Sequence, residues 1–173
     1  MNNIFQTMMD VVQDVTGVPV ILANQNAISL SGEYATILVV QSGEAESRGE
    51  VRQKLSEDGR DVTVTVKYPV TWNVTVNFFR GNAVANAAKL QRIHYLPKTS
   101  DKLLVAGIGF VTASSVLNLT DLQSKNFEQR AAITLTLTTF EEVEETVGVI
   151  LEAGGDVCDE SSNVVQKFVV QTH

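Results

Sequence analysis

The chain has 173 residues, 44% of them hydrophobic and 19% charged, which is enough apolar material to bury the core of one domain. Its formal net charge of −7 argues against a protein that grips nucleic acid through a basic face, because such a face needs clustered Lys and Arg. A single cysteine, Cys158, excludes an intramolecular disulfide. We therefore expect one domain, spanning residues 1–173, whose partners are proteins.

The residues that carry catalysis, metal binding and membrane insertion are not arranged in the patterns those functions need. The sequence contains no nucleophile–base pair, carboxylate dyad, phosphate loop or Cys/His cluster. It has no basic leader region, and no apolar run approaches the roughly 20 residues of a membrane helix. We predict no enzyme, cofactor, metal or membrane segment. The alternative from another class is a small enzyme or ligand-binding domain assembled from scattered residues such as Glu128, Arg130 and His94.

A helix and a buried strand are predicted near the start of the chain. Residues 3–16 carry apolar side chains at spacings of four, three and four, which predicts an amphipathic helix, and Gly17 ends it. Residues 19–30 form an extended connection. Residues 34–41, YATILVVQ, are β-rich and continuously apolar, which predicts a strand buried on both faces.

The composition changes at residues 42–58, where charged and small side chains dominate. The charged residues are Glu44, Glu46, Arg48, Glu50, Arg52, Lys54, Glu57 and Asp58. We interpret this segment as a mobile loop, since long loops in compact domains are often functional. The alternative is a short helix, because the apolar residues Val51 and Leu55 are four apart.

Residues 62–78 alternate between apolar side chains and Thr or Asn, the period of a half-buried strand. Pro69 lies between two alternating segments, 62–66 and 70–78, and cannot donate a ladder hydrogen bond, so it marks an edge, a bulge or the corner between them. The pattern fits a hairpin and one long bent strand equally well.

Helices are predicted again after the alternating strands. The first covers residues 83–96 and is stopped by Pro97, and a short one over residues 101–106 is capped by Ser100. Residues 108–119 are predicted as a strand.

The strongest strand signal lies at residues 127–140, FEQRAAITLTLTTF. From Ala131 the odd positions are apolar and the even positions are small or hydroxylated, which predicts one face on the core and one Thr-rich face. Glu128 and Arg130, spaced by two, are predicted to form a surface ion pair. The predicted core residues of the two alternating segments are Trp72, Val74, Val76, Phe78, Ile133, Leu135 and Leu137.

The chain becomes acidic beyond this strand, over residues of about 141–163. The acidic residues are Glu141, Glu142, Glu144, Glu145, Glu152, Asp156, Asp159 and Glu160. Such a run is usually a solvated face or loop. A divalent cation site at Asp156, Asp159 and Glu160 is a weaker alternative, since the spacing matches no calcium loop. Residues 164–170 are predicted as a last strand.

The order of these elements predicts an α+β fold, in which helices cover one face of a mainly antiparallel β-sheet. A fold of this class does not by itself fix a function. A series of segments, however, resembles the neck or tail terminator family of tailed bacteriophages over about residues 18–140. The segments are VPVILANQN at 18–26, GEYATILVV at 32–40, VTVNFF at 74–79, VLNLTDL at 116–122 and FEQRA at 127–131.

The resemblance implies a structural virion protein, assembled in the host cytoplasm, that forms a hexameric ring. Such a ring caps the tail tube and joins the tail to the head connector or neck proteins, with genome DNA passing through the lumen without specific binding. Another tail-completion or tube-like virion protein is the alternative. We expect the candidate assembly interface at Glu44, Glu46, Arg48, Arg52, Lys54, Glu128 and Arg130. We expect the candidate lumen or docking surface at Glu141, Glu142, Glu144 and Glu145.

Overall fold

The structure is a computed structural model that describes residues 2–24, 30–44, 49–123, 126–149, 152–158 and 164–171. It contains two compact units. The first unit comprises Met1–Ser47 and Pro69–Glu141, and the second comprises Arg48–Tyr68 and Glu142–His173. The fold is α+β with a mixed, mostly antiparallel seven-stranded sheet, which confirms the predicted class.

The seven-stranded sheet has the strand order β1-β2-β4-β9-β5, with β3 paired to β4 and β6 paired to β9. Its strands are β1 (Val20–Leu22), β2 (Tyr34–Glu44), β3 (Glu50–Leu55), β4 (Asp61–Phe79), β5 (Gly109–Ala113), β6 (Leu117–Asn118) and β9 (Arg130–Gly148). The first strand, β1, runs parallel to β2. The strands β2 and β3 run antiparallel to β4, and β5 and β6 run antiparallel to β9.

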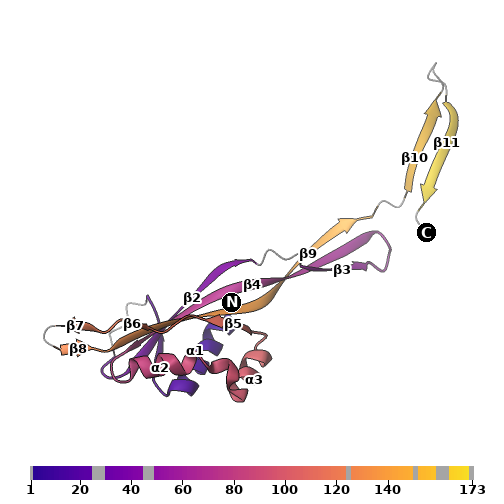
Figure 1. Cartoon of the computed structure of the whole chain (residues 1–173). Helices are drawn as coiled ribbons and strands as arrows, with labels where there is room; N and C mark the ends of the chain where they lie inside the picture. The colour runs from indigo at the N-terminus through magenta and orange to yellow at the C-terminus, as the bar shows by residue number, and fades with distance from the viewer. Residues whose placement is uncertain are drawn as a thin grey trace. The chain divides into compact units, whose positions relative to one another are not determined.

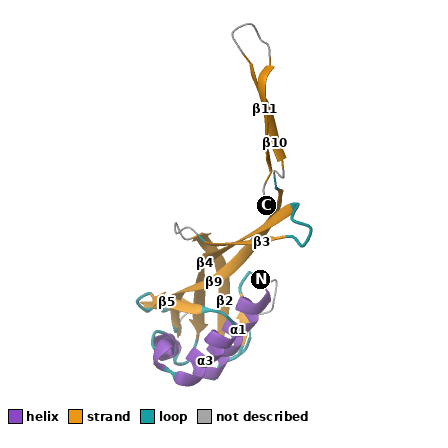
Figure 2. Cartoon of the chain, turned by 90° about the vertical axis from the view of Figure 1, so that its right-hand side faces the viewer, coloured by secondary structure: helices purple, strands orange, loops and turns teal. Residues whose placement is uncertain are grey.

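Three helices cover one face of the sheet in the first unit (Figures 1 and 2). They are α1 (Asn2–Thr16), α2 (Ala83–Leu90) and α3 (Pro97–Val105), with a 3₁₀ turn, η1 (Ile93–Tyr95), between the last two. Within the described part of the chain, none of these helices has the length and apolar character to span a membrane. Gly17 ends α1 as predicted, with a φ of 75° that favours glycine.

The predicted ends of the second and third helices are wrong. The predicted helix over residues 83–96 ends at Leu90 and is followed by η1. The predicted helix over 101–106 begins four residues earlier, with Pro97 at its N-terminus. Proline is favourable at the first helical position because its missing N–H has no intrahelical partner there. Pro97 therefore starts α3 and does not stop a longer helix.

The core of the first unit lies between the helices and one face of the strands, as the alternation of β4 and β9 predicts. Every predicted core residue on these strands is at most 5% exposed. The helices and η1 contribute Ile4, Met8, Val11, Val12, Ala87, Leu90, Ile93 and Leu103. Trp72 Nε1 donates a hydrogen bond to Thr139 Oγ1 at 2.9 Å, so the polar end of this ring is paired.

The opposite face of the same strands carries hydroxyl and amide side chains that pair across the sheet. Thr75 Oγ1 lies 3.1 Å from Thr134 Oγ1, and Thr136 Oγ1 donates to Asn73 Oδ1 at 3.1 Å. The helices leave this face open. The prediction that residues 34–41 are buried on both faces is therefore wrong, because the alternate side chains of β2 are exposed, with Val40 at 49%.

Residues 61–79 form one continuous strand, β4, so the hairpin alternative is excluded. The pairing register explains why Pro69 is tolerated in the middle of it. Pairing with β2 extends to Val70, and pairing with β3 begins at Lys67. Pro69 therefore lies between the two partners, where its missing N–H removes no ladder bond to either.

The segment 42–58, predicted as a loop with a helix as the alternative, is largely strand. The second strand, β2, extends to Glu44, and Glu50–Leu55 form β3. A compact turn joins β3 to β4: Ser56 N–H donates to the Asp61 carbonyl at 2.8 Å, and Asp61 N–H donates to Ser56 Oγ at 3.0 Å. This turn fixes the register of the pair, and the predicted mobility of the segment stays a prediction.

Two further two-stranded sheets complete the described chain. The first pairs β7 (Asp121–Gln123) with β8 (Asn126–Glu128), and the second pairs β10 (Glu152–Cys158) with β11 (Val164–Gln171). The strand predicted over 164–170 is confirmed. The acidic segment is not a loop, because β9 continues to Gly148 and β10 follows.

Candidate assembly surfaces

A charged ladder connects β4 and β9 in the second unit. Lys67 Nζ lies 3.5 Å from Glu142 Oε1, and Thr65 Oγ1 donates a hydrogen bond to Glu144 Oε1 at 3.3 Å. These four side chains share one face, since residues two apart on a strand point the same way. Glu142 and Glu144 are exposed, and the ladder thus presents carboxylates to solvent.

The neighbouring strand β3 extends the charged ladder. Register pairs Glu50 with Lys67 and Arg52 with Thr65. Arg52 Nε lies 3.0 Å from Glu50 Oε1. This hydrogen bond raises the pKa of the Arg52 guanidinium, and the negative charges of Glu50 and Glu142 act in the same direction. Because the pair is exposed, it adds little to the stability of the fold. Its effect is to place one positive and one negative charge side by side on the surface of β3.

The other face of the same three strands is apolar and exposed. Four apolar side chains on this face are about half exposed. Their exposed fractions are 57% for Val51, 57% for Leu55, 53% for Val143 and 48% for Val147. Register pairs Val51 with Val66 and Leu55 with Val62, both only partly buried. A contiguous apolar patch of this kind is unusual on a monomer and is typical of an interaction surface.

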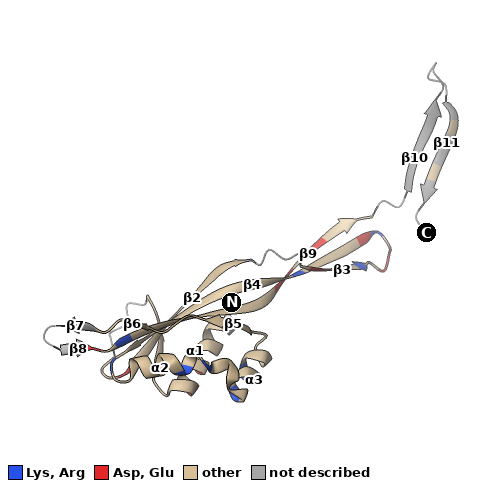
Figure 3. Ribbon diagram, in the orientation of Figure 1, with Lys and Arg blue, Asp and Glu red and all other residues tan. Residues whose placement is uncertain are grey.

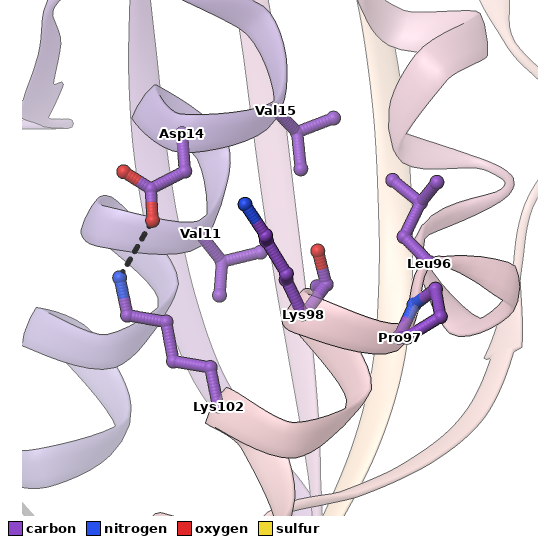
Figure 4. A pocket seen from close by; sticks show the side chains of 8 residues that line it. Val11, Asp14, Val15, Leu96, Pro97, Lys98 and Lys102 are labelled. Carbon is purple, nitrogen blue, oxygen red and sulfur yellow. Dashed lines mark hydrogen bonds and ion pairs between the residues drawn. The ribbon is translucent and has the colours of Figure 1, made fainter.

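A groove lies on the helical side of the first unit. It has a volume of about 780 Å³ and runs between α1, which supplies Val11 and Val15, and the start of α3, which supplies Leu96 and Pro97. Figure 4 shows Lys98 reaching across this groove toward α1. At one side of the groove Lys102 Nζ contacts Asp14 Oδ2 at 2.8 Å (Figure 4).

Basic residues lie along the ribbon of α2 and α3 (Figure 3). A second hollow of about 430 Å³ shares Val15 and Leu96 with the first and is lined by Lys89 and Arg92. Residues 83–105 carry four Lys or Arg and one acidic residue, Asp101, in a chain of net charge −7. The segment from α2 to α3 is therefore locally basic in an acidic protein, whereas α1 carries Asp10 and Asp14 and no Lys or Arg.

The family model of the phage neck terminator protein matches residues 6–161. The chain belongs to this family. The match covers most of the chain and includes residues of both units. No curated protein matches the sequence.

Membership of the neck terminator family identifies a structural component of the bacteriophage neck. The protein is therefore part of the virion and interacts with other neck or tail proteins. The prediction of the family from residues 18–140 is confirmed, and the match extends beyond those bounds on both sides.

Two of the expected interface residues of this neck protein are used inside the subunit. Glu128 is not paired with Arg130 but with Arg80, whose Nε lies 3.0 Å from Glu128 Oε1. Arg80 also donates to the Leu30 carbonyl at 2.6 Å. The guanidinium of Arg130 lies 4.7 Å from the centre of the Phe79 ring, a cation–π contact.

The predicted ion pair between Glu128 and Arg130 does not form, because both side chains bind residues at the end of β4. The spacing of two in the sequence gives no information about this neighbouring strand. Residues Glu128 and Arg130 each find a partner on β4 or just beyond it. Arg80 has a φ of 65°, so the chain turns sharply there and brings its guanidinium back to Glu128.

The remaining expected site residues fall into separate groups. Arg52 and Lys54 lie on the charged face of β3, whereas Glu46, Arg48 and the side chain of Glu44 lie outside the described residues. The four glutamates of β9 divide between two faces. Glu142 and Glu144 belong to the charged ladder, and alternation puts Glu141 and Glu145 on the apolar face with Val143 and Val147.

The described residues contain no cluster of three or more side chains able to hold a metal ion, and Asp159 and Glu160 lie outside them. Sequence reasoning missed the groove and the apolar patch. The clustering of Lys89, Arg92, Lys98 and Lys102 was a usable signal for the groove.

Proposed function

We propose that this neck terminator forms a closed ring that caps the tail tube and joins it to the head connector, with genome DNA passing through the lumen. The observation that carries the proposal is the family match over residues 6–161. The exposed apolar patch of β3, β4 and β9 supports assembly, since such patches mark interaction surfaces. A ring requires heterologous contacts, in which one face of a subunit meets a different face of its neighbour.

Both units take part in this role as one functional domain over residues 1–173. The strands β4 and β9 each contribute residues to both units, which supports a shared function. The exposed strand β3, with Arg52 and Lys54, is part of the assembly interface, together with the charged residues at 44–48 that precede it.

The charged ladder lines the lumen in this proposal. A ring repeats Glu142 and Glu144 around its axis, and the repeated carboxylates create a negative field in a confined space. DNA phosphates are then repelled from the wall, and the genome slides through without sticking. A basic lumen would instead hold phosphates through counterion release.

Ring formation is tested by size-exclusion chromatography with light scattering, followed by addition of the purified protein to uncapped tails. The expected result is a discrete ring, either in solution or on tail ends, and tails of fixed length. A protein that joins the tube along its whole length supports the tube-like alternative. A stable monomer that never binds tails contradicts the proposal.

The lumen assignment is tested with Glu142→Gln/Glu144→Gln. We expect normal folding and ring assembly but slower genome ejection from assembled virions, with the larger effect at low ionic strength, where screening is weak. The matched control is Glu33→Gln/Glu57→Gln, which removes the same charge from two exposed sites outside the charged ladder. If the variant ejected its genome at the wild-type rate at every salt concentration, the charged ladder would not line the lumen.

A further inference from the structure

We propose that the basic groove of one subunit receives the apolar, acidic face of β9 from a second copy of the chain. This inference rests on the proposed ring and identifies the two surfaces of the subunit that contact each other in it. It names the groove between α1 and α3 as one half of a heterologous interface. The face of β9 that carries Glu141, Val143, Glu145 and Val147, here called the β9 ridge, is the other half.

The groove has the shape and lining to accept a row of valine side chains. Val11, Val15, Leu96 and Pro97 form its floor and walls, over about 780 Å³. The adjoining hollow of about 430 Å³ continues past Val15 and Leu96. Leu96 is 43% exposed, so apolar surface remains accessible in the subunit, and burying it in an interface is favourable.

The rim of the groove supplies positive charge. Lys98 crosses its opening (Figure 4) and has no ion-pair partner among the described residues. Lys89 and Arg92 are exposed beside the second hollow. Lys102 forms an ion pair with Asp14. This pair positions the Lys102 amino group at the groove but also places the Asp14 carboxylate there.

The β9 ridge alternates acidic and apolar side chains. Val143 and Val147 are about half exposed, and Glu145 between them is exposed. Successive ridge positions are two residues apart on one strand, about 6.5 Å. Apolar groups therefore lie regularly between carboxylates, and next to them lie the partly exposed valines of β4.

The two surfaces are complementary in both apolar character and charge. Each combines an accessible apolar lining with an excess of charge of one sign, positive at the groove and negative on the β9 ridge, although Asp14 adds one carboxylate to the groove. Complementary charge steers association and fixes register, while the apolar contacts supply affinity. Because groove and ridge are different parts of the chain, the contact is head-to-tail and propagates from copy to copy, as ring closure requires.

A charge-swap experiment tests this pairing in the full-length chain. The groove variant is Lys98→Glu/Lys102→Glu, and the ridge variant is Glu141→Lys/Glu145→Lys. Each variant alone sets like charge against like charge at every interface. We expect each to lose ring assembly in light scattering, with at least a tenfold weaker association, while its circular dichroism spectrum and melting stay those of a folded subunit.

Mixing the two variants restores opposite charges at both kinds of interface. An alternating ring has an even number of subunits, so the six-membered ring implied by the family resemblance can close from an equimolar mixture. The combined four-substitution variant restores the pairing within one chain type and is expected to assemble alone. The matched control is Glu33→Lys/Glu57→Lys, which reverses two exposed charges outside the groove and the β9 ridge and is expected to assemble.

The outcomes separate this inference from the proposed function. Rings from either single variant, or no ring from the mixture and the four-substitution variant, overturn the pairing of groove and ridge. Variants that form rings but fail to cap tails show that a tail protein occupies the groove, which also overturns it. A wild-type chain that never forms a ring or binds tails overturns the proposed function itself.

Discussion

The two units of the neck terminator contain strands with the same alternating pattern but bury them differently. On β4, Val70, Val74 and Val76 are fully buried beneath helices in the first unit. Val62, Val64 and Val66 have the same spacing in the second unit and are only partly buried. The difference shows that alternation predicts which side chains share a face, whereas burial depends on what covers that face.

The two units also differ in what their apolar side chains contribute, which is stability of the fold in the first unit and assembly in the second. The first unit closes its apolar face with α1, α2 and α3, and its Thr and Asn side chains pair with one another on the open face. The second unit leaves apolar side chains of β3 and β9 half exposed. We therefore expect substitutions in the first unit to change folding, and substitutions in the second unit to change association.

The largest expected effect is on the core strand of the first unit. Leu135 is completely buried, and Leu135→Ala should lower the free energy of unfolding by about 2 to 5 kcal/mol through lost burial and a cavity. Its neighbour Thr134→Ala, on the open face, should cost about 1 kcal/mol. Chemical denaturation measures both. A threonine change more damaging than the leucine change would reverse the assignment of the two faces.

A matched pair of valines on β4 compares the units directly. Val74→Ala removes fully buried methyl groups and should cost about 1.5 to 3 kcal/mol. Val64→Ala removes the same groups from a partly exposed site and should cost under about 1 kcal/mol. Urea denaturation of the free subunit measures this difference. Equal losses at the two sites would mean that the second unit has its own covered core.

The smallest expected effect concerns the turn between β3 and β4. Ser56 Oγ donates to Asp58 Oδ1 at 2.6 Å, and the Arg60 N–H also donates to this carboxylate, so the pKa of Asp58 lies below its ordinary value. A carboxyl with a lowered pKa stabilises the fold above its unfolded-state pKa, and that contribution is lost as pH falls through the folded-state pKa.

This turn is tested by following the Asp58 carboxyl and the Arg60 amide by NMR as pH is lowered. We expect one acidic midpoint below that of an ordinary aspartate. The variant Asp58→Asn should abolish the titration of the Arg60 amide, with Glu57→Gln as the matched control. A midpoint at the ordinary value would show that the turn does not hold the carboxylate.

Much of the fold was predictable because β4 and β9 carry a clear period of two, and because the α1 sequence has helical spacing. The strand β3 was missed because its charged residues obscured the alternation of Val51, Gln53 and Leu55. The break between α2 and η1 was missed because the residues on both sides favour helix. The Arg80–Glu128 pair joins residues 48 positions apart, so local spacing gave no sign of it.

The most direct test of the account is amide hydrogen exchange in the free subunit and in the tail-bound ring. Residues 131–137, which carry the buried side chains of β9 in the first unit, should exchange slowly in both states. Residues 142–148 of β9 and residues 98–102 of α3 should exchange faster in the free subunit and become protected in the ring. Unchanged exchange at residues 142–148 would contradict the claim that the exposed face of the second unit is an assembly surface.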